Sequence, residues 1–428
     1  MYLRRRPRRK AVIFPTSIKL LLSLPALLIL ATCSSPPIKP TVTAPANTDF
    51  PTSTALEPQV DFWRKVYALW RTDQVVLHDD RYLQLVYEVI DLPSATGNNP
   101  ALEQDVIKTR QRALQQQLHD LEQTLAMQAP LAGEQQQLAE RISKTAGAGA
   151  IAGAAERLRN QRGLKEKFKL GLEISGRYER QFRQIFRNAG LPEDLALLPH
   201  VESSFQNQAR SNAGAVGMWQ FTRGAANLYM RRHPALDERR DPVASARAAA
   251  RYLGEAYAIL GNWPLALTSY NHGMAGIRKA SELYGPNLDD IIRLHDGSRF
   301  GFASRNFYAE FLAAREIALA PQRFFPEGIV YQTPRPLERI VLERAASVAE
   351  LARNYGVDQA TLADLNPAWT AVAFKDTMTL PEGIEVWLPS GALARAEQIR
   401  YSASAALSQS GNLTPVPILT SGSAPHND

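Results

Sequence analysis

The sequence predicts a mainly α-helical protein that ends in a small domain of mixed structure. Residues 161–325 show apolar residues at helical spacing throughout, with short breaks that contain glycine or proline. Residues 59–160 contain further helical patterns, such as Val60–Trp70 and Ala113–Gln128. From residue 337 the pattern changes to short strands and short helices. We therefore expect a helical N-terminal region, an all-α central domain and a small C-terminal module at 337–390.

The first 32 residues have the proportions of an export signal. A basic run that ends at Lys10 precedes the apolar stretch Leu20–Ala31, which is shorter than the roughly 20 residues that span a membrane. Cys33 follows this stretch after Thr32. It is the only cysteine, so no disulfide can form within the chain. Its context resembles a bacterial lipobox, in which the cysteine is lipidated, although Thr32 departs from the usual small residues. The alternative is a cysteine inside an ordinary cleaved signal.

The charge balance excludes a nucleic-acid partner. The formal net charge of the chain is +7. Residues 1–32 contain five Arg and two Lys without an acidic residue, so the remaining chain is neutral overall. No HExxH pattern or pair of cysteines is present, and the histidines are scattered, so we expect no metal site and no cofactor. Residues 33–58, rich in Pro, Thr and Ser, have the composition of a flexible tether.

The most informative segment is Leu191–Gln220, because it places Glu202 at the end of an apolar helix. Leu195 and Leu198 lie seven and four residues before Glu202, on the same predicted helix face. Burial disfavours the charged form of a carboxyl group and raises its pKa. A carboxyl group that stays protonated near neutral pH can act as a general acid. The alternative is a solvated glutamate at a frayed helix end.

Several residues after Glu202 are suited to binding a sugar. Gly217 lies in a turn rich in Gly, Ser and Asn, and glycine allows positive φ and close approach of a ligand. Gln220 offers a hydrogen-bond donor and an acceptor, and Asn271 offers a second amide. Tyr270 offers a ring face for a pyranose. The structural alternative is a plain turn followed by packed side chains.

Three short segments, taken in this order and spacing, carry a family resemblance. They are Glu202-Ser203 with Ser211–Gln220, then Ser269–Gly273, then Ser304–Tyr308. They are similar to the Glu-Ser pair and GA-x-G-[LM]-[MW]-Q turn, the [AS]-Y-N-x-G block and the R-x-Y-V block of the goose-type lysozyme and lytic transglycosylase family. The resemblance covers roughly residues 162–320.

The resemblance implies a lysozyme-like catalytic domain at 161–325 that acts on the glycan strands of peptidoglycan. It implies that Glu202 is the catalytic residue. The residues that it places against the substrate are Ser203, Ser211, Gly217, Met218, Gln220, Tyr270, Asn271 and Tyr308.

The third segment departs from the family pattern. Phe307 stands where the family commonly has tyrosine, and Tyr308 follows it. Either Tyr308 supplies the hydroxyl group through a local shift, or that hydroxyl group is dispensable here.

No second catalytic carboxylate is evident in the sequence. Asp194 lies eight residues before Glu202, and Glu193 lies on a different face. Asp237 and its acidic neighbours lie in a stretch with four arginines, which predicts a solvated surface. Most glycosidases use two carboxyl groups, whereas the resemblance implies a lytic transglycosylase in which one residue suffices.

In that reaction Glu202 would protonate the oxygen between N-acetylmuramic acid and N-acetylglucosamine. It would then deprotonate the muramoyl C6 hydroxyl, which closes on C1 to give a 1,6-anhydro sugar. Two alternatives remain open. One is a peptidoglycan muramidase that uses water as the nucleophile, and the other is a non-catalytic cell-wall-binding protein of the envelope.

Residues 337–390 predict a β-α-α-β order. The strand candidates are Arg339–Leu342 and Glu385–Leu388, and the helix candidates are Val348–Tyr355 and Gln359–Leu365. The order resembles a LysM carbohydrate-binding module, without the usual Gly-Asp-Thr opening. A degenerate domain that braces the catalytic one is the alternative. The Ala/Ser/Pro-rich tail, residues 391–428, predicts disorder.

The resemblance also implies a location. Ser34 follows Cys33, so no aspartate is present there to retain a lipoprotein at the inner membrane. By analogy with the family, we expect an outer-membrane lipoprotein that faces the periplasm.

Overall fold

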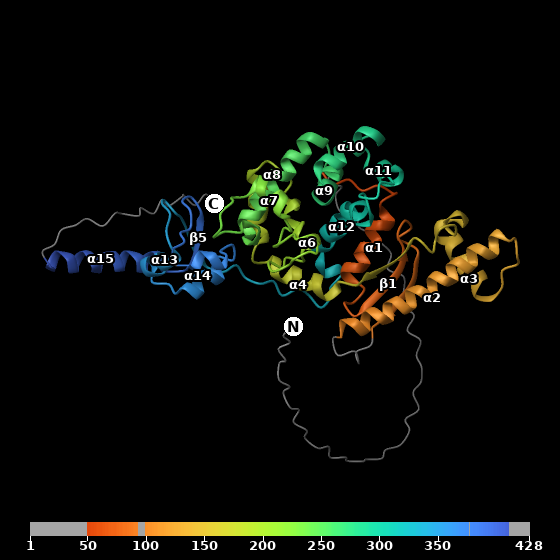
Figure 1. Ribbon diagram of the computed structural model, residues 1–428, viewed down its shortest axis with the longest axis horizontal. Helices are drawn as coiled ribbons and strands as arrows, with labels where there is room; N and C mark the ends of the chain where they lie inside the picture. The colour runs from red at the N-terminus through yellow and green to blue at the C-terminus, as the bar shows by residue number, and fades with distance from the viewer. Residues whose placement is uncertain (1–48, 93–98, 376, 411–428) are drawn as a thin grey trace, which may run out of the picture. The chain divides into compact units, whose positions relative to one another are not determined.

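The computed structural model describes residues 49–92, 99–375 and 377–410 (Figure 1). Helices dominate, which confirms the mainly α fold class. The signal, the lipobox and most of the tether lie outside the described residues. Within the described residues, no helix is both long enough and apolar enough to cross a membrane.

The N-terminal region contains a small sheet beside its helices. Helix α1 (Glu57–Ala68) precedes β1 (Gln74–Asp79) and β2 (Val86–Asp91), and β3 (Leu158–Arg162) follows two helices. The strand order is β2-β1-β3, and both pairings are antiparallel. The prediction that residues 59–160 are helical was therefore wrong for these strands. Strand β1 is buried at five of six positions, and a short buried strand lacks the alternation that would reveal it.

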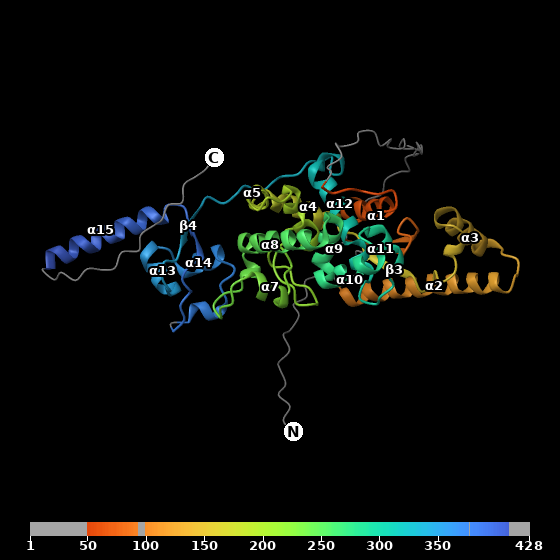
Figure 2. The ribbon, with the colours of Figure 1, turned by 90° about the horizontal axis from the view of Figure 1, so that it is seen from above.

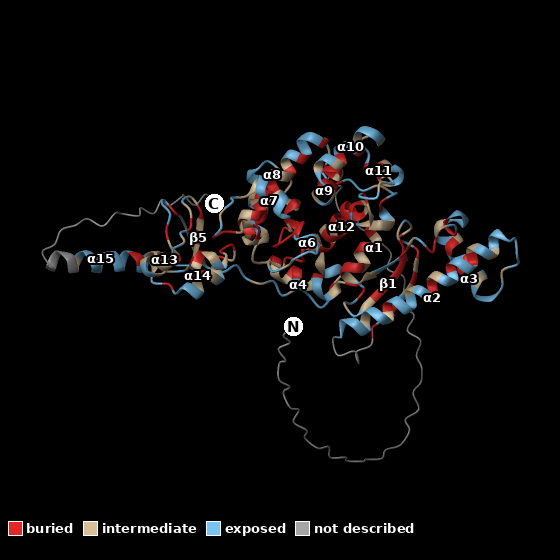
Figure 3. Cartoon of the chain, in the orientation of Figure 1, coloured by how far each residue is buried: buried red, intermediate tan, exposed pale blue. Residues whose placement is uncertain are grey.

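Helices α2 (Pro100–Ala126) and α3 (Gly133–Ala146) cover this sheet. Asn99 caps α2 by accepting a hydrogen bond from the backbone of Ala101 at 3.1 Å. Leu114, Leu118 and Ile142 are buried in a core that includes residues of β1. The outer side of α2 is exposed (Figure 3).

The central region is built from helices, and residues 163–336 contain no strand apart from isolated bridges. Its longest members are α8 (Pro242–Leu260) and α12 (Phe302–Leu319). The others are α4 (Lys165–Ser175), α5 (Glu179–Asn188), α6 (Pro199–Glu202), α7 (Arg223–Tyr229), α9 (Trp263–His272), α10 (Met274–Tyr284) and α11 (Leu288–Leu294). Helix α1 packs beside α12 (Figures 1 and 2), and residues of both share the largest core.

The C-terminal module has the predicted β-α-α-β order. Strands β4 (Leu337–Val341) and β5 (Glu385–Pro389) pair antiparallel around α13 (Val348–Tyr355) and α14 (Gln359–Leu365). The buried Asn366 fixes α14 to β5, because its side chain accepts from the Trp387 amide at 2.8 Å and donates to the Trp387 carbonyl at 2.9 Å.

The module also packs against the central region. Ala235 and Leu236 belong to its core, and the backbone of Thr370 donates to the carbonyl of Ala235 at 2.9 Å. Arg247 forms an ion pair with Glu385 at 2.9 Å.

The prediction of a disordered tail at 391–428 was wrong for its first half. Helix α15 occupies Ala392–Ser410, and Ala392 and Ala396 are buried. Alanine has the highest helix propensity, and here two alanines also bury their methyl groups. Residues 411–428 lie outside the described residues.

Candidate active site

The structure places Glu202 at the end of a single helical turn behind a wholly buried apolar segment. The 3₁₀ helix η3 (Glu193–Leu197) leads into α6, so the predicted apolar helix is a 3₁₀ helix followed by one α-helical turn. Leu195 and Leu198 have no exposed surface, as the predicted apolar face requires. Glu202 itself is half-buried. Its carboxyl group therefore lies between the core and the solvent.

Two causes raise the pKa of Glu202 to about 8. Burial of the carboxyl group is the larger cause, and the negative charge of Glu310 is the second. At neutral pH the group is therefore mostly protonated. This is the state that a general acid requires.

Glu310 is a second carboxyl group at the site, and it was not among the residues predicted from the sequence. It lies on α12, half-buried, and accepts a long hydrogen bond from the Tyr67 hydroxyl of α1 at 3.5 Å. Burial raises the pKa of Glu310 to about 8 as well. Helical spacing could have revealed it, because Glu310 lies three residues after Phe307, on the same face of the helix.

The carboxylates that the sequence analysis set aside are engaged elsewhere. Asp194 forms ion pairs with Arg183 and Arg315, both at 2.6 Å. Glu193 pairs with Arg187 at 2.7 Å. These contacts confirm that neither is a partner of Glu202.

The Gly217 turn is braced by a segment that we expected to be a solvated surface. Arg239 is buried, pairs with Asp237 at 2.8 Å and donates to the Gly214 carbonyl at 3.1 Å. Gly217 has φ of +86°, and a Cβ atom there would collide with the carbonyl oxygen of Arg239. The solvated-surface prediction was therefore wrong for Arg239, which holds the turn from behind.

Two predicted substrate-binding residues have structural roles. The Ser203 hydroxyl is buried and donates to the Met218 carbonyl at 2.8 Å, which ties α6 to the turn. Met218 has no exposed surface and packs in the main core. Direct contact of these side chains with a sugar does not fit this geometry. Ser211 is exposed, and its hydroxyl accepts from the Ala215 amide at 3.0 Å.

Gln220 and Tyr270 both donate hydrogen bonds to the backbone of the turn that contains Gly217. The Gln220 amide nitrogen donates to the Gly217 carbonyl at 2.7 Å and to the Ala209 carbonyl at 3.2 Å. Its side-chain oxygen is left to accept a hydrogen bond from a ligand. The Tyr270 hydroxyl donates to the Trp219 carbonyl at 2.9 Å. Burial, followed by the charge of Glu202, holds the pKa of Tyr270 well above its usual range.

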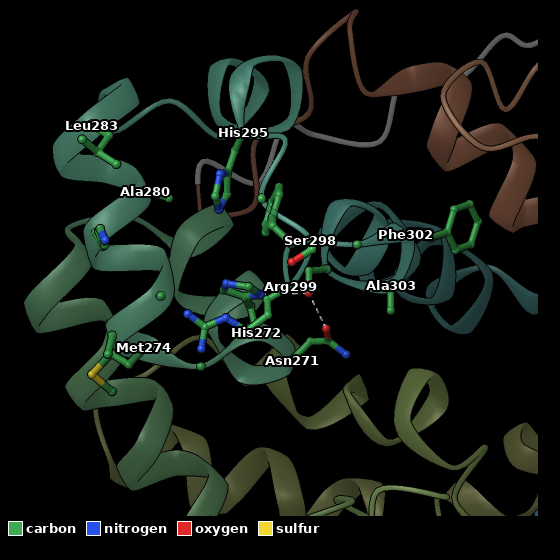
Figure 4. Close-up of a pocket in the computed structure, with 18 of the residues that line it drawn as sticks. Asn271, His272, Met274, Ala280, Leu283, His295, Ser298, Arg299, Phe302 and Ala303 are labelled. Carbon is green, nitrogen blue, oxygen red and sulfur yellow. Dashed lines mark hydrogen bonds between the residues drawn. The ribbon is translucent and has the colours of Figure 1, made fainter. Parts of the chain in front are cut away.

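Asn271 lies exposed at the C-terminal end of α9. Its side-chain oxygen accepts from the Ser304 hydroxyl at 3.0 Å, as the dashed line in Figure 4 shows. His272 contacts the same hydroxyl at 3.2 Å. The second and third family segments therefore meet at Ser304, with the Asn271 NH₂ group left to donate to a ligand.

The structure contradicts the prediction that Tyr308 binds substrate. Tyr308 has no exposed surface, and its hydroxyl donates to the Pro51 carbonyl at 2.7 Å. Phe307 instead stacks against Tyr270, with ring centroids 6.5 Å apart. Adjacent helix residues point about 100° apart, so only one of the two can face the site. Phe307 has that position and carries no hydroxyl.

Among the described residues, no group of three or more His, Cys, Asp or Glu side chains could hold a metal ion. The chemistry available at the site is that of two half-buried carboxyl groups, a tyrosine and two amides.

Residues 182–290 match the family model described as the transglycosylase SLT domain. These residues form a transglycosylase SLT domain. The match contains Glu202 and the first two family segments. It also agrees with the lysozyme-like fold that the resemblance implied.

The chain is also similar to the membrane-bound lytic murein transglycosylase D of Escherichia coli (strain K12), with 26% identity over 185 residues. The alignment covers 42% of this chain and 40% of that enzyme. The chain therefore spans less than half the length of this relative.

The comparison with solved structures found two lytic transglycosylases at low TM-scores. The lytic transglycosylase Slt of Pseudomonas aeruginosa, solved as an inactive mutant, has 15% identity and a TM-score of 0.30, covering 56% of this chain and 48% of its own. The 70 kDa soluble lytic transglycosylase of Escherichia coli has 14% identity and a TM-score of 0.30, covering 53% and 47%.

The Gly217 turn gives a test with an internal control. Gly217→Ala should lower the free energy of unfolding by about 2–5 kcal/mol, since the positive φ costs about 1–2 and overpacking about 1–3. Gly214→Ala has a similar φ of +77° but nothing within 4 Å of the added Cβ. It should lose only about 1–2 kcal/mol. Urea unfolding of both variants measures the difference, and equal losses would contradict the bracing by Arg239.

The position of Tyr308 predicts a structural and not a catalytic effect. Tyr308→Phe should cost about 1 kcal/mol of stability, because the Pro51 carbonyl loses its donor. Turnover of cell-wall glycan should remain near the wild-type rate. The companion Phe307→Tyr places a hydroxyl on the face toward Tyr270. A large loss of turnover in a folded Tyr308→Phe protein would contradict the structural role and show that the Tyr308 hydroxyl takes part in catalysis.

Proposed function

We propose that this protein is a peptidoglycan lytic transglycosylase. It cleaves the β-1,4 bond between N-acetylmuramic acid and N-acetylglucosamine and leaves a 1,6-anhydromuramoyl end. The observation that carries the proposal is Glu202 with a pKa of about 8, inside a transglycosylase SLT domain.

In the first step, Glu202 acts as the general acid. It donates its proton to the glycosidic oxygen while the bond from that oxygen to the muramoyl C1 breaks. The leaving N-acetylglucosamine departs as an alcohol, and positive charge develops at C1. The Glu202 carboxylate that remains lies close to this charge and stabilises it.

In the second step, the same residue acts as the base. The Glu202 carboxylate takes the proton of the muramoyl C6 hydroxyl, whose oxygen forms the new bond to C1. Glu202 is protonated again and no water is consumed. The nucleophile belongs to the same sugar, so its position is fixed before reaction, which can be worth about 7–11 kcal/mol of the barrier.

The polar groups around Glu202 fit a sugar chain. The Gln220 side-chain oxygen and the Asn271 NH₂ group remain open to a ligand, while their other polar atoms bond to the protein. Amide groups of this kind suit the hydroxyl and acetamido groups of the strand. We assign Gln220, Tyr270 and Asn271 to substrate binding, with Ser211 and the Gly217 backbone at the turn.

Glu310 favours one alternative, a muramidase. Most glycosidases that hydrolyse their substrate use two neighbouring carboxyl groups, and the second of them activates water or attacks the sugar. However, the raised pKa of Glu310 leaves it mostly protonated at neutral pH, and a protonated carboxyl group is a poor base. Glu310 loses its own proton only near pH 8, and its negative charge then opposes the loss of the second proton from Glu202. We therefore assign Glu310 to maintaining the proton on Glu202 as pH rises into this range.

The C-terminal module is less directly connected to the chemistry. Its element order supports a LysM-like module, and its contacts with Ala235 and Leu236 support a role in bracing the central region. We propose the bracing role, because Trp369 pairs with Leu236 and is itself buried.

The central test is Glu202→Gln, assayed by mass spectrometry of digested peptidoglycan. The substitution keeps the shape of the side chain and removes the transferable proton. Turnover should fall by at least about 10²–10⁴-fold, and binding to glycan should remain. Wild-type products should be one water lighter than hydrolysis products. Products of full hydrolytic mass would favour the muramidase, and an active Glu202→Gln protein would rule out the mechanism.

Glu310→Gln tests the second carboxyl group. Removing its negative charge should lower the pKa of Glu202, so Glu202 loses its proton at lower pH. The alkaline limb of the kcat/KM–pH profile should move down by about one unit. Glu316→Gln, which removes another half-buried α12 carboxylate with its ion pair to Arg64, is the control and should leave the limb in place.

A stability measurement separates this effect from misfolding. The folded protein raises the pKa of Glu310, so charging this group destabilises the fold as pH rises from about 4.5 to about 8. Glu310→Gln should therefore gain stability over the wild type at pH 8 and not at pH 4. An unshifted alkaline limb in a folded Glu310→Gln protein would contradict our assignment.

We also propose that a lipid on Cys33 anchors the protein to the outer membrane, where it faces the periplasm. The lipobox-like segment supports the anchor, and the relative is membrane-bound by its name. Cys33→Ala should move the protein from the membrane fraction to the soluble fraction, with its specific activity retained. A variant that stays with the membrane would contradict the anchor.

A further inference from the structure

A large pocket lies directly beside the candidate site. Its volume is about 1190 Å³, and it is formed by the end of α9, helix α10, residues 295–301 and the start of α12 (Figure 4). Asn271 and Ser304 form part of its wall. A glycan strand that reaches Asn271 therefore also reaches the mouth of this pocket.

The lining of the pocket carries only positive formal charge. Arg159, Lys279 and Arg299 line it, and no aspartate or glutamate does. None of the ion pairs among the described residues involves these three side chains. Arg159 lies over the Phe302 ring, 4.5 Å from its centroid, and this cation–π contact orients its guanidinium.

The backbone adds to this positive potential. Gly273 and Gly301 are the N-cap residues of α10 and α12, and neither helix has a side-chain cap or an acidic residue in its first turn. The first residues of both helices line the pocket. Uncapped N-terminal amide groups carry partial positive charge, which favours an anion.

His272 differs from the arginines and the lysine of the pocket. Burial, the neighbouring His295 and the charge of Arg299 together lower the pKa of His272, which disfavours its charged form. The proposal therefore rests on the charges of Arg159, Lys279 and Arg299.

We propose that this pocket binds the carboxylate groups of the peptide that a peptidoglycan strand carries, next to the cleavage site. This inference rests on the proposed function. The sugars of the strand are uncharged once the muramoyl lactyl group is joined to peptide by an amide bond, so its anions lie on the peptide. The volume exceeds what one small anion fills and suits a ligand of many atoms.

The experiment compares two substrates. One is purified glycan strands with their peptides, and the other is the same strands after carbodiimide and ammonium chloride have converted the peptide carboxylates to amides. The readout is the ratio of kcat/KM on the two substrates. The wild type should prefer strands with free peptide carboxylates, and added salt should weaken that preference by screening the charges.

The variant is Lys279→Gln combined with Arg299→Gln. Each lost charge pair is worth up to about fivefold, so the loss of two should reduce the preference by up to about 25-fold. Arg278→Gln removes a neighbouring charge of α10 that pairs with Glu282 outside the pocket. It is the matched control and should keep the wild-type ratio. Arg159→Gln repeats the test from β3, in case the double variant unfolds.

The outcomes separate this inference from the proposed function. A wild type that cleaves neither substrate would overturn the proposed function. A wild type that cleaves both substrates with equal efficiency, or pocket variants that keep the full preference, would overturn the peptide site alone.

Discussion

The proposed chemistry depends on one constraint: the carboxyl group of Glu202 must keep its proton at the boundary between the core and the solvent. Burial is the main cause of the raised pKa of Glu202, and the charge of Glu310 is the second. Both causes require that distant segments meet: α6 carries Glu202, α12 carries Glu310, and α1 supplies Tyr67. The N-terminal region is therefore part of the site's electrostatics, although it carries no family motif. Removing α1 would expose Glu310 as well as the core.

Such a site costs stability, and the surrounding core offsets the cost. Two carboxyl groups with raised pKa values favour the unfolded state once pH exceeds their ordinary range. Phe168, Phe186 and Trp219 are fully buried around α6, and each large aromatic side chain contributes several kcal/mol through its buried area. Figure 3 shows this burial concentrated around α6, α9 and α12.

The sequence predicted the local chemistry of the site better than its three-dimensional neighbours. Glu202 and the turn at Gly217 were placed by short patterns, because their geometry is set within a few residues. Glu310 and Arg239 were missed, because what they touch is decided by packing between distant segments. Tyr308 was misassigned for a related reason. The motif gives a residue type, but it does not say which face of the helix carries that residue. The strands of the N-terminal sheet were missed because β1 is buried between two strands, and one of them, β3, lies about 80 residues later in the chain.

The positively charged pocket and the protonated Glu202 have opposite electrostatic requirements. A positive charge close to Glu202 would lower its pKa and release its proton, which would remove the general acid. The cationic side chains Lys279 and Arg299 are not among the causes that set the pKa of Glu202, although their pocket shares Asn271 with the site. Positive charge that binds a substrate and a carboxyl group that stays protonated can therefore coexist in one domain. The part of the pocket lining that also belongs to the candidate site, Asn271 with its partner Ser304, is uncharged.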